Sequence, residues 1–317
     1  MKRIFITRPL PAPVIAEAEK HFRVEVREKT TPLTRTERRA AMALYDGIVP
    51  TLGDNFNEQV LQGGPHRCKI LANFGVGYNH IDADFAAENG ICVTNTPGAL
   101  TDATADIALM LMLMTCRRAA EGERMVRSGQ WEGWHPTQML GLHLSGKRLG
   151  IVGMGRIGQA IAKRAHFGFG MEVAYFNRSP KKVDVPATQL KSLKTLAANV
   201  DVLVISVPGG TNTKHLIDAD ILAVMKSHAH LVNIARGDVV DENALITALQ
   251  TGQIGGAGLD VYENEPDVPA ALLKLNNVTL LPHLGTAALE VRTAMGMLAV
   301  ENLRAFFEGE GLPNPVN

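Results

Sequence analysis

The segment that most limits how this chain of 317 residues can fold is LGIVGMGRIG at residues 149–158. A short apolar run leads directly into the glycine turn GMGRIG (153–158), and a helical pattern, QAIAKRA, follows at once. Gly153 permits a tight turn, Gly155 lets the backbone approach a ligand, and Gly158 lets the helix pack closely on the strand. The spacing therefore predicts the first strand, turn and helix of a dinucleotide-binding domain, with a pyrophosphate at the helix N-terminus.

Short apolar runs alternate with helical stretches on both sides of this turn. Strands are expected at 3–7, 46–50, 69–74 and 91–97, and again at 147–155, 171–177, 200–208, 229–236, 256–262 and 278–285. Helices are expected at 13–22, 85–89, 100–129, 156–167, 188–198, 218–227, 241–250 and 290–309. This alternation indicates parallel sheets that are covered by helices on both faces.

A chain of 317 residues is longer than one core usually fills, so two domains are expected. We predict an α/β fold of two doubly wound parallel-sheet domains. A Rossmann-type dinucleotide-binding domain, residues 99–287, would be inserted in a flavodoxin-like substrate (catalytic) domain formed by residues 1–98 plus 288–317. The helix at 290–309 would then cross back and pack on the first domain. The helix at 100–129, with Asp102 or Thr101 as N-cap and Gly129 as its end, is apolar on more than one face, which is typical of deep burial or a subunit interface.

The overall charge and the cysteines exclude several classes of protein. Lys plus Arg and Asp plus Glu number 32 each, so no global field attracts nucleic acid or an anionic membrane. Cys68, Cys92 and Cys116 lie in apolar runs without metal-ligand spacing, which indicates core packing in a reducing compartment. The longest apolar run, 107–114, is far shorter than the roughly 20 residues of a membrane span. We expect a cytoplasmic protein without a metal.

The second strand of the dinucleotide-binding domain ends in AYFNRSPKK (174–182), where such domains often place an acidic residue. A carboxylate there accepts hydrogen bonds from the adenosine ribose and repels a 2′-phosphate. Asn177 is neutral, Arg178 can form paired bonds to phosphate oxygens, and Ser179 can donate another. The pattern favours NADP(H) as the cofactor, with NAD(H) possible; an exposed basic turn that faces water is the alternative.

Three polar residues follow predicted strands at the edge where doubly wound sheets build their sites. Arg236 lies in NIARGDVVDENAL, Glu265 in GLDVYENEP and His283 in LLPHLGTAALEVR. Taken singly, each has a structural explanation: Arg236 as a surface arginine, Glu265 as a loop glutamate and His283 as a helix-capping histidine. Together they supply a cation, a carboxylate and an imidazole from three strand ends.

The sequence resembles the D-isomer-specific 2-hydroxyacid dehydrogenase family over essentially its whole length. The resemblance rests on LANFGVGYNHID (71–82), TNTPGALTDATAD (94–106), GMGRIG, NIARGDVVDENAL, GAGLDVYENEP and PHLGTAALEVR. Within the family the chain looks most like glyoxylate/hydroxypyruvate reductases and the related hydroxyphenylpyruvate reductases. It departs from many relatives at Gly209-Gly210, Asn79 and Ala288, which puts fine specificity in doubt but not the reaction class.

The resemblance implies reduction of a small 2-keto acid to a D-2-hydroxy acid. His283 would be the acid, Glu265 would orient it, and Arg236 would hold the substrate carboxylate and polarise its carbonyl. Leu52, Val76 and Gly77, with Arg236 and His283, are the implied substrate-binding residues. The implied cofactor-binding residues are Thr104, Gly153, Gly155, Arg156, Ile157, Gly158, Asn177, Arg178, Ser179, Val207, Pro208, Thr213, Ile234, Ala235, Asp260, His283 and Gly285.

Two further readings stay open at this point. The same mechanism with a larger pocket would reduce phenylpyruvate-type acids, and a nucleotide-sensing corepressor could keep the Arg–Glu–His set without turnover. Formate-oxidising relatives pair the catalytic His with Gln, so Glu265 argues against that branch. A homodimer is expected from the apolar long helix, and Trp131 and Trp134 would pack against the partner subunit or enter its active site.

Overall fold

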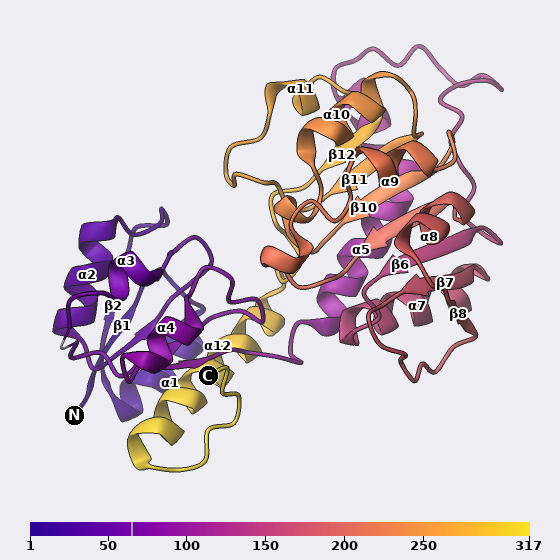
Figure 1. Cartoon of the computed structure of the whole chain (residues 1–317). Coiled ribbons are helices and arrows are strands. Elements are labelled where there is room, and N and C mark those ends of the chain that lie inside the picture. Colours follow the sequence, from indigo (N-terminus) through magenta and orange to yellow (C-terminus); the bar gives the residue numbers. More distant parts are fainter. Residues whose placement is uncertain (65) are drawn as a thin grey trace. The chain divides into compact units, whose positions relative to one another are not determined.

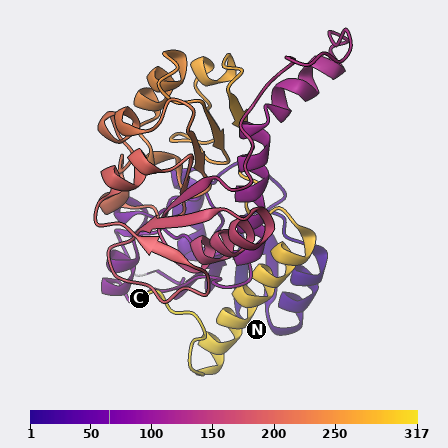
Figure 2. The same ribbon diagram turned by 90° about the vertical axis from the view of Figure 1, so that its right-hand side faces the viewer.

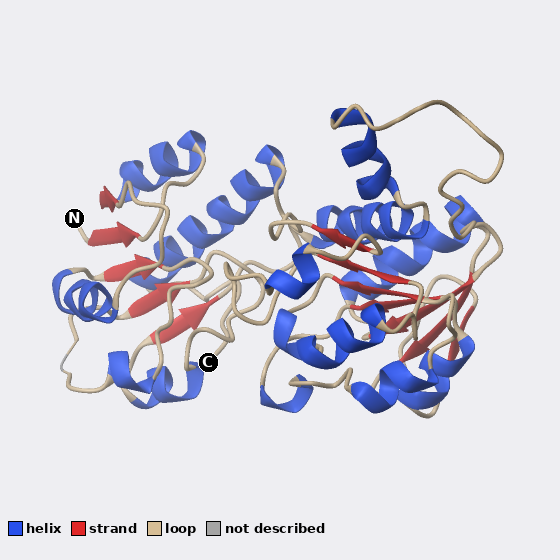
Figure 3. Ribbon diagram, turned by 90° about the horizontal axis from the view of Figure 1, so that it is seen from above, coloured by secondary structure: helices blue, strands red, loops and turns tan. Residues whose placement is uncertain are grey.

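The computed structural model describes residues 1–64 and 66–317. The chain divides into two compact units, which are coloured along the sequence in Figure 1. The first unit consists of Met1–Leu100 with Thr286–Asn317, and the second of Thr101–Gly285. The fold class is confirmed, because each unit has a parallel sheet, of five and seven strands, and the sheets carry helices on both faces (Figure 3).

The first unit has the strand order β2-β1-β3-β4-β5, which is that of flavodoxin-like sheets. Its strands are β1 (Arg3–Ile6), β2 (Arg23–Val26), β3 (Gly47–Val49), β4 (Ile70–Ala72) and β5 (Cys92–Thr94). Its helices are α1 (Ala12–His21), α2 (Arg35–Leu44), α3 (Glu58–Leu61), α4 (Ala83–Glu88) and α12 (Leu289–Glu308). The edge strand β2 and the helices α2 and α3 were not predicted.

Successive residues of the strands in the first unit point to opposite faces and build two apolar layers. On one face, side chains of β1, β3 and β4 pack against α12 through Ala299 and Leu303. On the other face, Phe5, Ile48 and Leu71 pack with residues of α2, α3 and α4. The last helix of the chain therefore completes the core of the unit that contains the N-terminus.

The second unit has the strand order β12-β11-β10-β9-β6-β7-β8, in which the chain reverses direction across the sheet at β6 and β9. Its strands are β6 (Arg148–Val152), β7 (Glu172–Phe176), β8 (Ala187–Gln189), β9 (Val202–Ile205), β10 (His230–Asn233), β11 (Gly256–Leu259) and β12 (Val278–Leu280). Its helices are α5 (Thr101–Cys116), α6 (Ala119–Arg127), α7 (Arg156–Phe169), α8 (Leu193–Asn199), η1 (Thr211–Thr213), α9 (Ala219–Val224), η2 (Gly237–Val239), α10 (Glu242–Gln250) and α11 (Ala270–Leu273).

The sheet of the second unit also separates two apolar cores. Helices α5 and α7 cover one face, where Leu149, Ile151 and Val204 are fully buried. Helices α8, α9 and α10 cover the other face, where Leu203 of β9 and Leu231 of β10 are fully buried. In doubly wound sheets, ligands bind at the carboxyl ends of the strands beside the point of reversal, here β6 and β9.

Two helices differ from their predictions. The expected helix at 100–129 is broken, because Arg118 has a left-handed backbone with φ 53° and separates α5 from α6. Helix α5 begins at Thr101, so Thr101 and Asp102 both lie in its first turn and neither is the predicted N-cap. The expected helix at 188–198 is also wrong in its first part, since Ala187–Gln189 is the edge strand β8.

The segment that follows α6 extends away from the sheet of its own unit (Figure 2). It carries large apolar side chains in solvent: Trp131, Trp134 and Leu140 are 53%, 78% and 68% exposed.

Burial of Cys68 and Cys116 raises the pKa of each thiol to about 12, as expected of core cysteines. No helix within the described ranges 1–64 and 66–317 is both long and apolar enough to cross a membrane.

Candidate active site

The glycine turn joins β6 to α7 in the second unit, as its sequence predicts. A Cβ atom on Gly158 would lie 2.2 Å from the carbonyl oxygen of Gly153, so the helix packs against the strand only because this residue is glycine. A Cβ atom on Gly155 would meet no atom within 4 Å, so the backbone there is open to a ligand. The N-cap of α7 is Gly155, which has no side chain to cap the first turn, so the amide groups there are available to an anion. These features fit the pyrophosphate of a dinucleotide.

The predicted NADP(H) residues form a turn directly after β7. The Asn177 side chain accepts from the amide of Met154 at 3.2 Å and donates to the carbonyl oxygen of Ser179 at 2.8 Å. Asn177 therefore connects the glycine turn to the basic turn. Arg178 is exposed, and its guanidinium has no hydrogen bond or ion pair with any residue that the structure describes. It can accept an anionic ligand without first losing another contact.

The loop after β9 lies against the glycine turn. A Cβ atom on Gly153 would be 2.9 Å from Cγ1 of Val207, so the two segments are in close contact. Thr213, in the short helix η1, donates from its hydroxyl to the carbonyl oxygens of Pro208 at 2.8 Å and Gly210 at 3.1 Å. The Thr213 side chain thus shapes this loop, and the predicted cofactor residues Val207 and Pro208 lie on it.

Arg236 follows β10 in a turn that a buried amide holds in place. Asn233 is 1% exposed, accepts from the amide of Ala235 at 3.0 Å, and donates to the carbonyl oxygen of Arg236 at 2.8 Å. Ile234 and Ala235 are themselves buried, so this part of the turn offers mainly its backbone to a ligand. Burial lowers the pKa of the Arg236 guanidinium, opposed by the nearby charge of Glu265.

His283 and Glu265 form a close pair at the ends of β12 and β11. Nδ1 of His283 lies 2.8 Å from Oε2 of Glu265, and each side chain is 30% exposed. The amide of Tyr262 donates to Oε1 of Glu265 at 3.1 Å, which fixes the carboxylate from its other side. Although burial acts to raise it, the pKa of Glu265 is lowered overall by the hydrogen bond to His283, by the Tyr262 amide and by the charge of Arg236.

Asp260, also at the end of β11, holds the backbone on which His283 lies. Its carboxylate accepts from the amides of Leu284 at 2.6 Å and Gly285 at 2.8 Å, and its carbonyl oxygen accepts from the His283 amide at 3.0 Å. The Thr104 hydroxyl donates to the carbonyl oxygen of Gly285 at 3.1 Å. Asp260 is 1% exposed, and burial raises the pKa of its carboxyl. Three of the predicted cofactor residues, Asp260, Thr104 and Gly285, are therefore in one bonded group.

Arg236, Glu265 and His283 follow β10, β11 and β12, which are neighbours in the sheet. These three strands are labelled in Figure 1. An imidazole that is hydrogen-bonded to a carboxylate can transfer a proton, and a nearby guanidinium can bind a carboxylate or polarise a carbonyl. No cluster of three or more metal-ligating side chains occurs in residues 1–64 and 66–317.

The predicted substrate loop lies in the first unit, after β4. Asn73 donates from its side chain to the carbonyl oxygens of Gly75 and Gly77, each at 3.0 Å, and Asn95 donates to that of Val76 at 2.9 Å. All three carbonyl groups are thus occupied within the unit. The amides of Val76 and Gly77 donate to no residue in the described part of the chain, so they are available to an anion.

Several residues that shape these loops were not identified from the sequence. Asn233, Asn73 and Asn95 hold turns through their side-chain amides, and each follows or ends a strand. Asn at a strand end is a general signal for a side chain that bonds its own turn, as Asn233 and Asn73 do, whereas Asn95 bonds the carbonyl oxygen of Val76 in another loop. The pair of His215 Nε2 with Glu263 Oε1, 2.9 Å apart, was also missed.

Comparison with known proteins identifies the family of this chain. Residues 109–285 match the model of the D-isomer specific 2-hydroxyacid dehydrogenase NAD-binding domain. The chain therefore belongs to the D-isomer-specific 2-hydroxyacid dehydrogenase family, and it is an NAD(P)-dependent oxidoreductase of that class.

Individual relatives match along almost the full chain. A glyoxylate reductase of Thermococcus litoralis is 44% identical over 321 residues, covering 99% of this chain and 96% of the relative. A glyoxylate reductase of Pyrococcus horikoshii is 44% identical over 322 residues with the same coverage. A solved structure of an NADPH-dependent glyoxylate/hydroxypyruvate reductase from Sinorhizobium meliloti, in complex with NADP and malonate, is 39% identical with a TM-score of 0.89, covering 99% of this chain and 96% of that one.

Proposed function

We propose that this protein is an NADPH-preferring reductase of small 2-keto acids, such as glyoxylate and hydroxypyruvate, to D-2-hydroxy acids. The observation that carries the proposal is the His283–Glu265 pair, 2.8 Å apart at the carboxyl edge of a dinucleotide-binding sheet. The glyoxylate reductases among its relatives and the malonate complex of the related reductase support a small acid as substrate.

The residues of the second unit supply the proton and hold the charge of the substrate. When bound, the nicotinamide cofactor supplies a hydride to the carbonyl carbon of the keto acid. His283 donates the proton to the carbonyl oxygen from Nε2, while Glu265 holds Nδ1 and stabilises the protonated ring. Arg236 binds the carboxylate of the substrate and polarises its carbonyl. In the reverse reaction His283 accepts the proton.

The substrate carboxylate is also assigned to the glycine turn of the first unit. The amides of Val76 and Gly77 would donate to it, because the neighbouring carbonyl groups are already held by Asn73 and Asn95. Leu52 would supply an apolar contact to the small carbon skeleton of the acid.

The NADPH preference is assigned to the turn after β7. A 2′-phosphate would bind the exposed guanidinium of Arg178 and the hydroxyl of Ser179, and Asn177 presents no negative charge against it. Asn177 is already used to connect the glycine turn with Ser179, so it acts mainly by shaping the turn.

One experiment tests both parts of this proposal. Initial rates are measured for the unmodified protein and for Arg178→Ala with NADPH and NADH, each with glyoxylate, hydroxypyruvate and phenylpyruvate. The unmodified protein should turn over the two small acids faster with NADPH. Arg178→Ala should raise the KM for NADPH about tenfold or more, as expected for one lost charge-assisted phosphate contact, with little change for NADH. Equal losses with both cofactors would remove Arg178 from the 2′-phosphate site.

The same rates decide between the proposal and its two alternatives. A rate that is highest with phenylpyruvate would favour the hydroxyphenylpyruvate type of reductase. Tight NADPH binding without turnover of any 2-keto acid would favour a nucleotide-sensing protein. A homodimer remains part of the proposal, supported by the exposed Trp131 and Trp134 on the segment after α6, and sedimentation of the purified protein tests it.

A further inference from the structure

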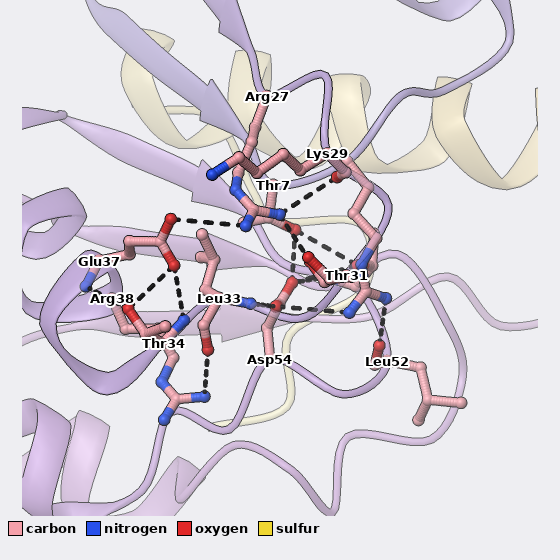
Figure 4. A network of polar contacts seen from close by, with 12 residues as sticks. Thr7, Arg27, Lys29, Thr31, Leu33, Thr34, Glu37, Arg38, Leu52 and Asp54 are labelled. Atoms are coloured by element: carbon pink, nitrogen blue, oxygen red, sulfur yellow. Dashed lines mark hydrogen bonds and ion pairs between the residues drawn. The ribbon is translucent and has the colours of Figure 1, made fainter. Parts of the chain in front are cut away.

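A carboxylate with no solvent exposure lies in the first unit, in the turn that follows β3. Asp54 is 0% exposed. Its Oδ2 accepts from the Thr7 hydroxyl at 2.6 Å and from the amide and hydroxyl of Thr51 at 3.2 and 3.1 Å. Its Oδ1 accepts from the Leu33 amide at 2.9 Å and lies 3.6 Å from Nη2 of Arg8. The network is shown in Figure 4.

These donors come from three separate parts of the chain. Thr7 and Arg8 follow β1, Leu33 precedes α2, and Thr51 follows β3. A buried carboxylate is costly unless hydrogen bonds and a counter-charge compensate it, and Asp54 has both. Loss of the carboxylate would leave several donors in the interior without an acceptor, so it locks the three segments together.

The network holds the backbone around Leu52 most closely. The amide of Asp54 donates to the carbonyl oxygen of Thr51 at 3.0 Å and closes a tight turn around Leu52 and Gly53. Nη1 of Arg8 donates to the carbonyl oxygen of Leu52 at 2.5 Å. Gly53 has φ 93°, and a Cβ atom there would lie 3.1 Å from Nη2 of Arg8. The peptide groups on both sides of Leu52 are therefore fixed.

The side chain of Leu52 is placed differently from the other leucines near it. It is partly exposed and belongs to none of the apolar clusters found in the described residues of this unit, whereas Leu33 and Leu61 are core residues. Figure 4 shows it directed away from the polar network. Its position is thus determined by the hydrogen bonds of its backbone and not by packing.

We propose that Asp54 and Arg8 are positioning residues that fix the Leu52 turn for recognition of the 2-keto acid. The inference rests on the proposed function, in which Leu52 contacts the substrate. Neither Asp54 nor Arg8 touches the acid in this scheme. They hold Leu52 so that its side chain is presented in one position, and no rearrangement of the turn is needed when a substrate binds.

The test is a double-mutant cycle with Asp54→Asn, Leu52→Ala and the double variant. KM and kcat are measured for glyoxylate, and the NADPH dissociation constant is measured by cofactor fluorescence. Asp54→Asn keeps the shape of the side chain but directs an amide toward groups that are donors, so the turn shifts. KM for glyoxylate should rise about tenfold, with kcat and NADPH affinity changed by less than about threefold.

The double variant identifies the route of the effect. If Asp54 acts through Leu52, the KM of the double variant should stay within about twofold of that of Leu52→Ala. If the two increases multiply, Asp54 does not act through Leu52 and the inference is overturned. Absence of turnover by the unmodified protein would instead reject the proposed function, so the two failures are distinguishable.

A second variant and a control address loss of folding. Arg8→Met removes the donor to the Leu52 carbonyl oxygen but keeps the Thr and amide partners of Asp54, and it should raise KM by a smaller factor, about threefold. Asp46→Asn is the matched control, because Asp46 accepts from the amide of Arg3 at 2.7 Å and pairs with Arg67 at the opposite end of the same sheet. It should lower the thermal midpoint without changing KM. A KM for Arg8→Met equal to that of the unmodified protein, or a raised KM in Asp46→Asn, would count against a specific role of the network.

Discussion

Two histidine–glutamate pairs lie in the second unit, and they differ in the ring nitrogen that the carboxylate holds. Glu265 holds His283 through Nδ1 at 2.8 Å, whereas Glu263 holds His215 through Nε2 at 2.9 Å. Both histidines have left-handed backbones, with φ 53° for His283 and 50° for His215. The two glutamates are two residues apart on the segment after β11. The pairs are thus alike in composition, distance and backbone, and only one is proposed to be catalytic.

The choice of nitrogen decides which imidazole can act on a ligand. Nδ1 is bonded to Cγ, the ring atom that carries Cβ, and so lies close to the backbone of its own residue, whereas Nε2 is at the tip of the ring. In His283 the tip has no hydrogen bond within the described chain, so it can reach a substrate oxygen. In His215 the tip is occupied by Glu263. A carboxylate pair with histidine is therefore not sufficient evidence for acid–base chemistry.

The backbones of the two histidines are also held differently. Three amides, of His283 and the two following residues, bond to Asp260. The amides of His215 and the two following residues also donate hydrogen bonds, but to the carbonyl oxygens of three separate residues, Asp238, Thr213 and Val239, at 2.7, 3.2 and 3.0 Å. A left-handed non-glycine residue costs about 1–3 kcal/mol, and such strain persists where the surroundings fix it. At His283 a single buried residue, Asp260, holds all three amides, two of them through its carboxylate, and such a fixed backbone suits the precise positioning of a proton donor.

The largest effect is expected from His283→Ala. Loss of a general acid should lower kcat by about 100- to 10,000-fold, while the NADPH dissociation constant changes by less than about threefold. Steady-state rates with glyoxylate and fluorescence titration with NADPH measure the two quantities. A variant that keeps more than a tenth of the activity would show that another group supplies the proton.

A much smaller effect is expected from His215→Ala. The pair is partly exposed, with 38% and 24% of the two side chains accessible, so its loss should reduce the free energy of unfolding by about 1 kcal/mol or less. kcat should stay within about threefold of the unmodified protein, because His215 only joins two loops. Urea unfolding and the same rate assay test this, and a loss of kcat as large as that of His283→Ala would remove the distinction between the pairs.

Much of the fold follows from local pattern, and the exceptions have physical reasons. The apolar runs of β1, β4 and β9 are buried strands, and their β-branched and apolar residues predict this directly. The RVEV segment of β2 is an edge strand with charged residues, so periodicity does not distinguish it from a loop. Helix α2 is rich in charge, but its capping box of Thr34 with Glu37 was a signal that could have predicted its start.

The break in the long helix could not be predicted in the same way. Arg118 takes a left-handed conformation although its sequence neighbours are Arg117 and Ala119, neither a glycine nor a proline, and its guanidinium bonds to Glu121 at 2.8 and 2.9 Å. Such a break depends on tertiary contacts, which a helical pattern does not contain.

The residues proposed for catalysis were predictable because parallel strands end at one edge of a sheet. Arg236, Glu265 and His283 follow three successive strands, and these strands are neighbours in the sheet. The second pair was not predictable, because the meeting of His215 with Glu263 depends on a left-handed backbone and a long loop. The role of Asp54 was not predictable either, since its donors are distant in sequence.

The difference between the two histidine–glutamate pairs is tested most directly by the pH dependence of kcat/KM for glyoxylate reduction. This profile is measured for the unmodified protein, for Glu265→Gln and for Glu263→Gln. The pKa of Glu265 lies below its ordinary value of 4.5, so this carboxyl is ionised near neutral pH and gives His283 a charged partner. In the reductive direction the rate should fall as pH rises, because the acid loses its proton. Glu265→Gln should change this profile, because the neutral amide cannot supply the negative charge that faces the ring of His283. Glu263→Gln should leave it in place. An unmoved profile in Glu265→Gln, or an equal shift in both variants, would contradict the assignment of His283 and Glu265 as the acid–base pair.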